Sequence, residues 1–401
     1  MKKLFTMIAL FIAVIFLFSC AEKAPDSAKE IAELKEKVAS LTKENEDLKK
    51  KIDELTKKLE AVAAKKLKAG FIYVGPVGDL GWSHAHDVGR KFAESKLPWL
   101  ESVFIESIPE ADSARIIDRY IQEEKCDVVF TASFGYMDDT IKAGMKYPDK
   151  HFMHCSGFKQ SKNVGTYFAD LYQMYYLNGL MAGALTKSNK IGYVGAFPIP
   201  EVVRHIDAFA LGAKAANPDA KVHVRWIYAW VGPDKAKEAA EALIAEGCDN
   251  LAFTEDTPAV IEVGQEHTEK GKQIYTYAHY SPMQKYGVDS VVSGQLVDWG
   301  VMYVKILQSL YDGTWTKDDL WWLAAENAAI LGGDFDNPIN PKFVGDLKAA
   351  TIKTKAFGDI SAYDLVMKRY EQMKKGSDVF EPFTGPISDN TGELKIKKGA
   401  K

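Results

Sequence analysis

Net charge, cysteine and catalytic motifs are all scarce in this sequence of 401 residues. Lysine and arginine number 51 and aspartate and glutamate 55, so the formal net charge is −4. No global basic field therefore draws the chain to nucleic acid. The sequence has no Gly-x-Ser-x-Gly elbow and no His-Glu-x-x-His helix, and His84 and His86 followed by Asp87 do not have a zinc-site spacing. We therefore predict no enzyme, no metal site and no cofactor.

The N-terminal residues have the pattern of an export signal. Two lysines precede an apolar run from Leu4 to Phe18, which is shorter than the roughly 20 residues needed to span a membrane. The run ends in Leu17-Phe18-Ser19-Cys20, which resembles the bacterial lipobox. We predict that residues 1–19 are a lipoprotein signal peptide and that Cys20 carries lipid. The protein would then be extracytoplasmic, in the cell envelope, and anchored to a membrane. The alternative is an uncleaved N-terminal anchor.

Only three further cysteines are present, Cys126, Cys155 and Cys248. An odd number cannot all pair. We expect them to be small buried hydrophobic residues without a disulfide framework.

The segment from Glu22 to Lys68 has no glycine and no aromatic residue, and 24 of its 47 residues are charged. Such a composition cannot form a globular core. Its apolar residues nevertheless recur in heptads. The a positions are Ile31, Val38, Asn45, Ile52 and Leu59, and the d positions are Leu34, Leu41, Leu48, Leu55 and Val62.

This heptad pattern predicts a coiled-coil stalk over residues 20–67. Branched residues at most a positions with leucine at d favour a parallel dimer, and Asn45 in the seam sets register and strand number. The g and e′ positions supply attractive charge pairs, Glu30 with Lys35 and Glu44 with Lys49. We expect a parallel homodimer through residues 31–62. The alternative is a single solvated helix that serves only as a stalk.

Beyond Ala69, short β-branched and aromatic runs alternate with amphipathic stretches. Such alternation indicates parallel sheets with helices on both faces. The remaining stretch, about 330 residues, is longer than a typical single doubly wound domain. We predict two α/β lobes, an N-terminal lobe at 68–187 and a C-terminal lobe at 188–320. Residues 321–401 would cross between the lobes or pack on them.

Ligands of open α/β sheets bind beyond the carboxyl ends of the strands. The loop after the first predicted strand has its glycines in a G-x-x-G-x-x-G spacing, which is not the dinucleotide fingerprint. Aromatic and acidic residues gather in this loop and in three others that follow strands: Asp79, Trp82 and Ser83; Tyr136, Asp138 and Asp139; Trp230 and Asp234; and Asp256.

Two facing indole rings with hydrogen-bond acceptors nearby suit a flat, nitrogen-rich ring. Two alternatives stay open. A loop tryptophan can be a packing lid, and Asp139 and Asp234 can be helix N-caps.

Five separated segments together resemble one known family. They are Gly70–Arg90 with Gly-Asp-Leu-Gly-Trp at 78–82, Thr131–Asp138, Pro198–Val203, Asp312–Trp315 followed by Trp321 and Trp322, and Pro382–Ile387. In this order they resemble the basic membrane protein family of substrate-binding lipoproteins, the purine-nucleoside-receptor type that feeds ABC importers. The resemblance implies a type I periplasmic-binding-protein fold, with two doubly wound parallel-sheet lobes joined by a hinge. It also implies a purine base or purine nucleoside in the cleft, and ABC permease and ATPase subunits as partners.

The resemblance also assigns roles to individual residues. Trp82 matches the aromatic residue of the N-terminal lobe that stacks on the base, and Trp230 the one opposite it. Asp138 resembles the acid that pairs with base nitrogens, with Asp139 as a competitor. The remaining expected contacts are Asp79, Ser83, Tyr136, Asp256, Asp298 and Trp299.

The sequence departs from the family pattern after the predicted strand at 273–277. Nucleoside-binding relatives carry an aspartate there for the ribose hydroxyls, whereas this chain reads Ala278-His279-Tyr280-Ser281-Pro282. This departure favours a free base such as adenine over a nucleoside.

A rival interpretation uses the same cleft. A pair of binding lobes on a coiled-coil stalk also suits a sensor or an adhesin that does not feed an importer. An enzyme acting on purine nucleosides is a third interpretation, without a motif to support it.

The seam residue Asn45 provides a test of the coiled coil. Replacing it by isoleucine removes the polar pair that sets strand number, so we expect Asn45→Ile to change the oligomer number or the register of the exported protein. Analytical ultracentrifugation measures this, with Ser40→Ala outside the seam as control. A monomeric parent with unchanged sedimentation of the variant would reduce the segment to a single-helix stalk.

Overall fold

The computed structural model describes residues 26–400 apart from Asp79 and Asp318. The predicted signal peptide, Cys20 and Asp79 therefore lie outside the described residues. The chain divides after Lys66 into two units, an N-terminal helical unit and a larger α/β unit. Among the described helices, none combines the length and apolar character needed to cross a membrane.

The described part of the N-terminal unit is built on one uninterrupted helix, α2 (Asp26–Ala64). Residues 26–64 of the predicted stalk are thus helical, with no break in the heptads from Ile31 to Val62. Its predicted seam faces solvent in the single chain, with exposed fractions of 37% at Ile31 to 61% at Val38. The helix is confirmed, and its pairing into a coiled coil stays a prediction.

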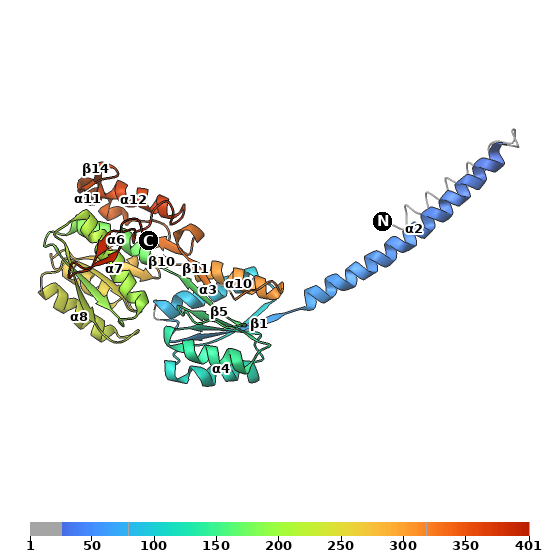
Figure 1. Cartoon of the computed structure of the whole chain (residues 1–401), viewed down its shortest axis with the longest axis horizontal. Coiled ribbons are helices and arrows are strands. Elements are labelled where there is room, and N and C mark those ends of the chain that lie inside the picture. The colour runs from blue at the N-terminus through green and yellow to red at the C-terminus, as the bar shows by residue number, and fades with distance from the viewer. Residues whose placement is uncertain (1–25, 79, 318, 401) are drawn as a thin grey trace. The chain divides into compact units, whose positions relative to one another are not determined.

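The N-terminal lobe is built on a six-stranded parallel sheet in the order β11-β5-β4-β3-β1-β2. Its strands are β1 (Leu67–Tyr73), β2 (Leu100–Ile105), β3 (Val128–Ala132), β4 (His151–Cys155), β5 (Val164–Ala169) and β11 (Asp319–Trp322). Its helices are α3 (Trp82–Lys96), α4 (Ser113–Gln122), α5 (Met137–Lys146) and α10 (Trp299–Tyr311). Helices α3 and α10 lie side by side, and α4 and α5 form a second pair (Figure 1).

The C-terminal lobe repeats this plan in the order β12-β10-β9-β8-β6-β7, with only β12 antiparallel. Its strands are β6 (Lys190–Gly195), β7 (Lys221–Trp226), β8 (Asn250–Thr254), β9 (Tyr275–Tyr280), β10 (Val291–Val297) and β12 (Ala329–Leu331). Its helices are α6 (Tyr172–Leu185), α7 (Pro200–Ala216), α8 (Pro233–Ala245) and α9 (Ala259–Glu269). The two predicted doubly wound lobes are therefore present.

The chain crosses between the lobes three times: from β5 to α6, from β10 to α10, and from β11 to β12. The predicted boundary at residue 187 is wrong, because α6 packs against α7 in the C-terminal lobe. Assigning residues 299–320 to the C-terminal lobe is also wrong. Helix α10 packs on α3, and β11 pairs with β5 in the N-terminal sheet.

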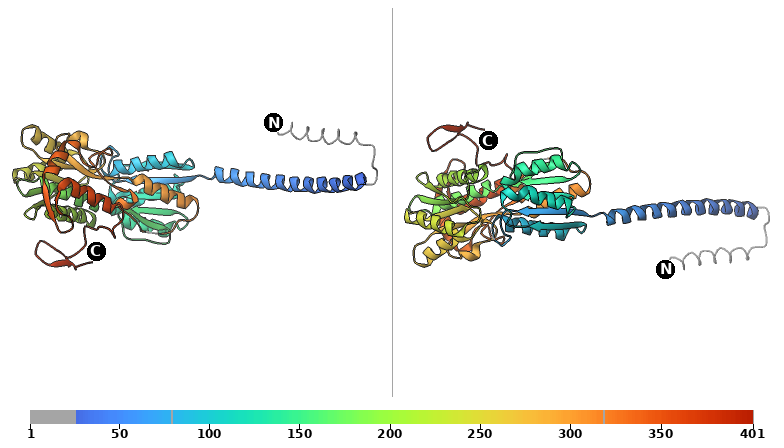
Figure 2. Two further views of the ribbon diagram at one scale, coloured as in Figure 1. Left: turned by 90° about the horizontal axis from the view of Figure 1, so that it is seen from above. Right: turned by 90° about the horizontal axis from the view of Figure 1, so that it is seen from below.

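The remaining residues pack on the C-terminal lobe, as expected for most of 321–401. They form α11 (Val344–Ala349), β13 (Thr351–Thr354), β14 (Gly358–Ser361) and α12 (Ala362–Met373), of which α11 and α12 contact α6. The final hairpin, β15 (Ile387–Ser388) with β16 (Leu394–Ile396), extends beside the lobe (dark red in Figure 2).

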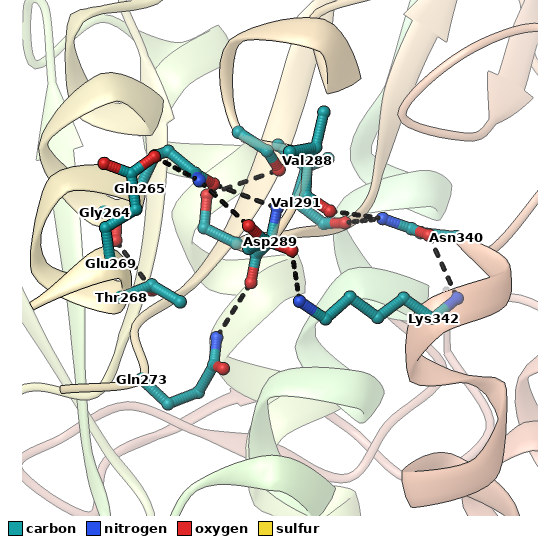
Figure 3. A network of polar contacts seen from close by, with 12 residues as sticks. Gly264, Gln265, Thr268, Glu269, Gln273, Val288, Asp289, Val291, Asn340 and Lys342 are labelled. Carbon is teal, nitrogen blue, oxygen red and sulfur yellow. Dashed lines mark hydrogen bonds and ion pairs between the residues drawn. The ribbon is translucent and has the colours of Figure 1, made fainter. Parts of the chain in front are cut away.

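A polar network holds the residues just before α11 (Figure 3). Lys342 forms an ion pair with Asp289, the Asp289 amide donates to Gln265, and Asn340 donates to the Val291 carbonyl.

Burial is continuous across the lobes. The largest hydrophobic cluster contains residues of α3, α6, α7 and α10, and α6 is apolar and buried nearly all round. A helix that is buried on every side belongs to a core and not to a surface layer. Cys126, Cys155 and Cys248 are buried and unpaired, as expected.

The first crossover is held by a buried acid. Asp170 accepts hydrogen bonds from Arg204 (2.5 Å) and His205 (2.9 Å), both on α7, and its amide donates to Trp322 at the third crossover. Burial alone would raise the pKa of Asp170, but the His205 hydrogen bond and the Arg204 charge outweigh it and lower the pKa. The crossovers are therefore fastened to each other and to α7.

Asp170→Asn is expected to destabilise the protein by about 1.5–3 kcal/mol near neutral pH, because it removes the charged hydrogen-bond acceptor of the partly buried Arg204 guanidinium and of the buried His205. A carboxyl group whose folded pKa is lowered stabilises the fold above its ordinary pKa, so the difference from wild type should shrink as the pH falls below 3.8. Urea denaturation as a function of pH measures this, with exposed Asp219→Asn as the matched control. Equal unfolding free energies for Asp170→Asn and wild type at pH 7 would show that the buried acid does not hold the crossovers.

Candidate ligand-binding site

A narrow pocket lies between the lobes, where the carboxyl ends of the two sheets meet. About 340 Å³ of space lies between its atoms, part of it open to solvent, which is near the lower end for small-molecule pockets. The N-terminal lobe supplies Val74, Trp82, Ser133, Phe134 and Ser156. The C-terminal lobe supplies Ile199, Glu201, Trp230, Thr254, Asp256 and Tyr280.

Trp82 begins helix α3 and is held from three sides. Its indole nitrogen donates to the Ala132 carbonyl (2.8 Å), and its ring meets Tyr280 and Trp299 edge-on at 5.3 and 5.4 Å. Its side chain is only 6% exposed. Because the indole N–H is already used within the protein, Trp82 offers a ligand its ring and no hydrogen-bond donor.

Asp256 joins the two lobes. One of its carboxyl oxygens accepts a hydrogen bond from the Trp82 amide (3.0 Å), and its own amide donates to the Trp230 carbonyl (2.9 Å). Gly81 makes this approach possible, since a Cβ at Gly81 would lie 2.5 Å from the Asp256 Cα. Trp82, Trp230 and Asp256 are thus brought together, as the sequence predicts.

A second acid of the pocket, Glu201, was not anticipated. It lies in the first turn of α7, is 7% exposed, and accepts a hydrogen bond from the Tyr280 hydroxyl (3.1 Å). Burial raises the pKa of the Glu201 carboxyl to about 7; Arg204 opposes this rise and Asp170 adds to it. The positional signal was present, because Pro200 marks a helix start just after a strand of the C-terminal sheet.

The expected acid Asp138 does not line the pocket. Its side chain is 65% exposed and forms an ion pair with Lys159 (2.5 Å), so the prediction that it faces a ligand is wrong for this structure. Tyr136 is fully buried and donates its hydroxyl to the Ile108 carbonyl. Ser133 and Phe134, just before them, are the residues of this loop that reach the pocket.

Three other residues that were expected to contact a ligand, Ser83, Asp298 and Trp299, are not among the residues that line the pocket. The Ser83 hydroxyl accepts a hydrogen bond from the Gly75 amide and so braces the first loop. Asp298 caps helix α10 by accepting from the Gly300 amide (2.8 Å). Trp299 is buried, stacks on His86 (4.3 Å) and supports Trp82. Among the described residues, no three acidic, histidine or cysteine side chains gather as a possible metal site.

Comparisons with known proteins agree with this geometry. The family model described as "ABC transporter substrate-binding protein PnrA-like" (Bmp) matches residues 66–357. A Haloferax volcanii protein provisionally named as ABC transporter glucose-binding protein TsgA13 is 40% identical over 64% of this chain and 64% of its own length. The Brucella abortus purine-binding protein BAB2_0673 is 35% identical over 85% of this chain and 90% of its own length. A solved ABC transporter solute-binding protein from Aeropyrum pernix shares the fold, with a TM-score of 0.65 at 16% identity, over 78% of this chain and 92% of that one.

Gly81 provides a test of lobe closure that needs no ligand. A valine there would push against Asp256, so we expect Gly81→Val to shift the protein towards a form with separated lobes. Spin labels on α4 and α8 would report a larger population at long distance. Gly78→Val is the matched control in the same loop, because a Cβ at Gly78 meets nothing within 4 Å. Identical distance distributions for both variants would argue against closure through this contact.

Proposed function

The chain belongs to the Bmp family of PnrA-like ABC transporter substrate-binding proteins, and we propose that it captures a purine base or a purine nucleoside between its two lobes. Proteins of this kind bind a solute for an ABC importer and are not enzymes. Its partners are then the permease and ATPase subunits of that importer. The family match favours transport over the sensor or adhesin interpretation.

The combination of aromatic and acidic side chains in the pocket carries this proposal. Trp82 and Phe134 come from one lobe and Trp230 from the other, and Glu201 and Asp256 supply buried carboxyl groups. Stacking a nucleobase on an aromatic ring is worth about 1–3 kcal/mol per base. Carboxylates accept hydrogen bonds from ring or amino N–H groups. The purine-binding Brucella relative supports the same ligand class.

The mechanism we propose is binding with closure. A ligand that touches both lobes stabilises the closed form by contacts it cannot make in the open form. The three crossovers act as the hinge, and the Trp82–Asp256 hydrogen bond is made only when the lobes meet. The permease would distinguish the closed form from the open one. No covalent step is required.

A hexose is the second candidate ligand, because the Haloferax relative carries a name for glucose binding. Aromatic rings and carboxyl groups also suit a sugar. Parallel titration with D-glucose therefore belongs to every binding experiment on this protein.

We further propose that Cys20 carries a lipid anchor and that α2 pairs with a second copy through residues 31–62. The apolar seam of α2 supports this pairing, because Ile31, Leu34, Val38 and Leu41 stay exposed in a single chain. Burial of such a stripe against a parallel copy would remove it from water. The anchor rests on the sequence pattern at Leu17–Cys20.

Trp82→Ala is expected to raise the dissociation constant for adenine at least tenfold, because the ligand loses a stacking face worth about 1–3 kcal/mol. Isothermal titration calorimetry measures this. Trp99→Ala is the matched control, since Trp99 stacks on Tyr311 and does not line the pocket. An unchanged titration for a folded Trp82→Ala variant would remove the stacking role. Tight binding of D-glucose without adenine binding would favour the hexose.

A further inference from the structure

Tyr280 has an unusual backbone for a large side chain. It ends strand β9 with φ of 62°, in the left-handed region that favours glycine. The strand ladder fixes the residue, because Tyr280 is in register with Leu296 of β10. Such strained residues persist where the surrounding structure demands them, and they gather at ligand sites.

The Tyr280 ring closes one end of the pocket. It reaches from the C-terminal lobe to the Trp82 ring of the N-terminal lobe, with 5.3 Å between centroids. Tyr280 and Trp82 are only 4% and 6% exposed. A bulky group on a ligand atom at this end would therefore meet a ring and find no open space.

Glu201 lies at the same end. The Tyr280 hydroxyl donates to one of its carboxyl oxygens. Among the described residues, no hydrogen bond to its other oxygen is found, and the residue lines the pocket. An ionised carboxylate only accepts hydrogen bonds, so a ligand must bring an N–H or O–H donor to this oxygen.

Purine bases and nucleosides differ in this kind of donor. A free base carries an acidic imidazole N–H, whereas a nucleoside carries its sugar on that ring. Carboxylates form their stronger hydrogen bonds in the charged state, with acidic donors as the best partners. The imidazole N–H of a free base can therefore donate to Glu201. The same nitrogen carries no sugar in a free base, so nothing would collide with the Tyr280 ring.

We propose that Glu201 and Tyr280 form a recognition pair that takes the unsubstituted imidazole N–H of a purine base and so excludes the nucleoside. This inference rests on the proposed function and narrows its ligand to the free base. Glu201 holds the N–H, and the Tyr280 ring occupies the place that a ribose would need.

Ligand binding through Glu201 should depend on pH. Burial raises the pKa of Glu201 to about 7. The Arg204 charge lowers this pKa, and the Asp170 charge raises it further. The ionisable groups that interact with it are Arg204 on α7, Asp170 at the crossover, Tyr193 on β6, Cys155 on β4 and Tyr280 on β9. Asp256, after β8, lines the same pocket. A ligand N–H needs the ionised carboxylate, so adenine affinity should be about tenfold weaker at pH 6 than at pH 8.

A cycle of ligands and variants tests the pair. Calorimetry with the exported protein compares adenine, 9-methyladenine and adenosine on wild type and Glu201→Gln. We expect wild type to bind adenine at least 30-fold more tightly than 9-methyladenine, which lacks the imidazole N–H. Glu201→Gln should weaken the binding of adenine at least tenfold and change the affinity for 9-methyladenine by no more than about twofold. It should also abolish the pH dependence of adenine binding. Glu238→Gln on the exposed face of α8 is the matched control.

Tyr280→Gly is the second variant, because glycine keeps the left-handed backbone without the ring. It should bind adenosine at least tenfold more tightly than wild type does. Equal affinity of wild type for adenine and 9-methyladenine, or equal weakening of both by Glu201→Gln, overturns the recognition pair while the purine site stands. Absence of binding to adenine and adenosine alike overturns the purine site and with it this inference.

Discussion

Three crossings of the chain between the lobes determine where the other parts of the binding domain lie. Each crossing leaves a sheet at its edge strand or at the strand next to the edge and enters the other lobe, and the loops at the carboxyl ends of both sheets meet. Loops that follow β1, β3 and β4 then meet loops that follow β6, β7, β8 and β9. The buried acid Asp170 fastens this arrangement, because it binds α7 and the third crossover at once. The pocket is a result of topology before any particular side chain is considered.

Hydrogen bonds within the protein determine which groups of each pocket residue remain available to a ligand. Trp82 uses its indole N–H on Ala132, so only its ring remains for a ligand. Asp256 accepts a hydrogen bond from the Trp82 amide, and this bond links the two lobes. Glu201 accepts from Tyr280 with a single oxygen. Similar side chains thus have different roles because their partners differ.

The sequence predicted the alternation of strands and helices, the two lobes, and the pocket positions of Trp82, Trp230 and Asp256. These features follow from local patterns and from the rule that ligands bind at strand ends. The lobe boundaries were missed because α6 and α10 follow their strands in the usual way, and nothing local shows that the chain changes lobe first. Asp138 was misplaced because its loop reaches the pocket four residues earlier, at Phe134. Glu201 was overlooked because an acid in a first helical turn is common, and its Tyr280 partner is 79 residues away.

Both carboxyl groups that line the pocket belong to the C-terminal lobe, whereas the N-terminal lobe contributes rings and serine hydroxyls. The acids of the pocket thus lie in one half of the molecule, while aromatic rings from both halves, among them Trp82, Trp230 and Tyr280, enclose it. Evolution can therefore retune the ligand by substitutions in a single lobe, without altering the surface that closes over it. The Brucella and Haloferax relatives, which are similar to this chain in sequence, are named for different ligands.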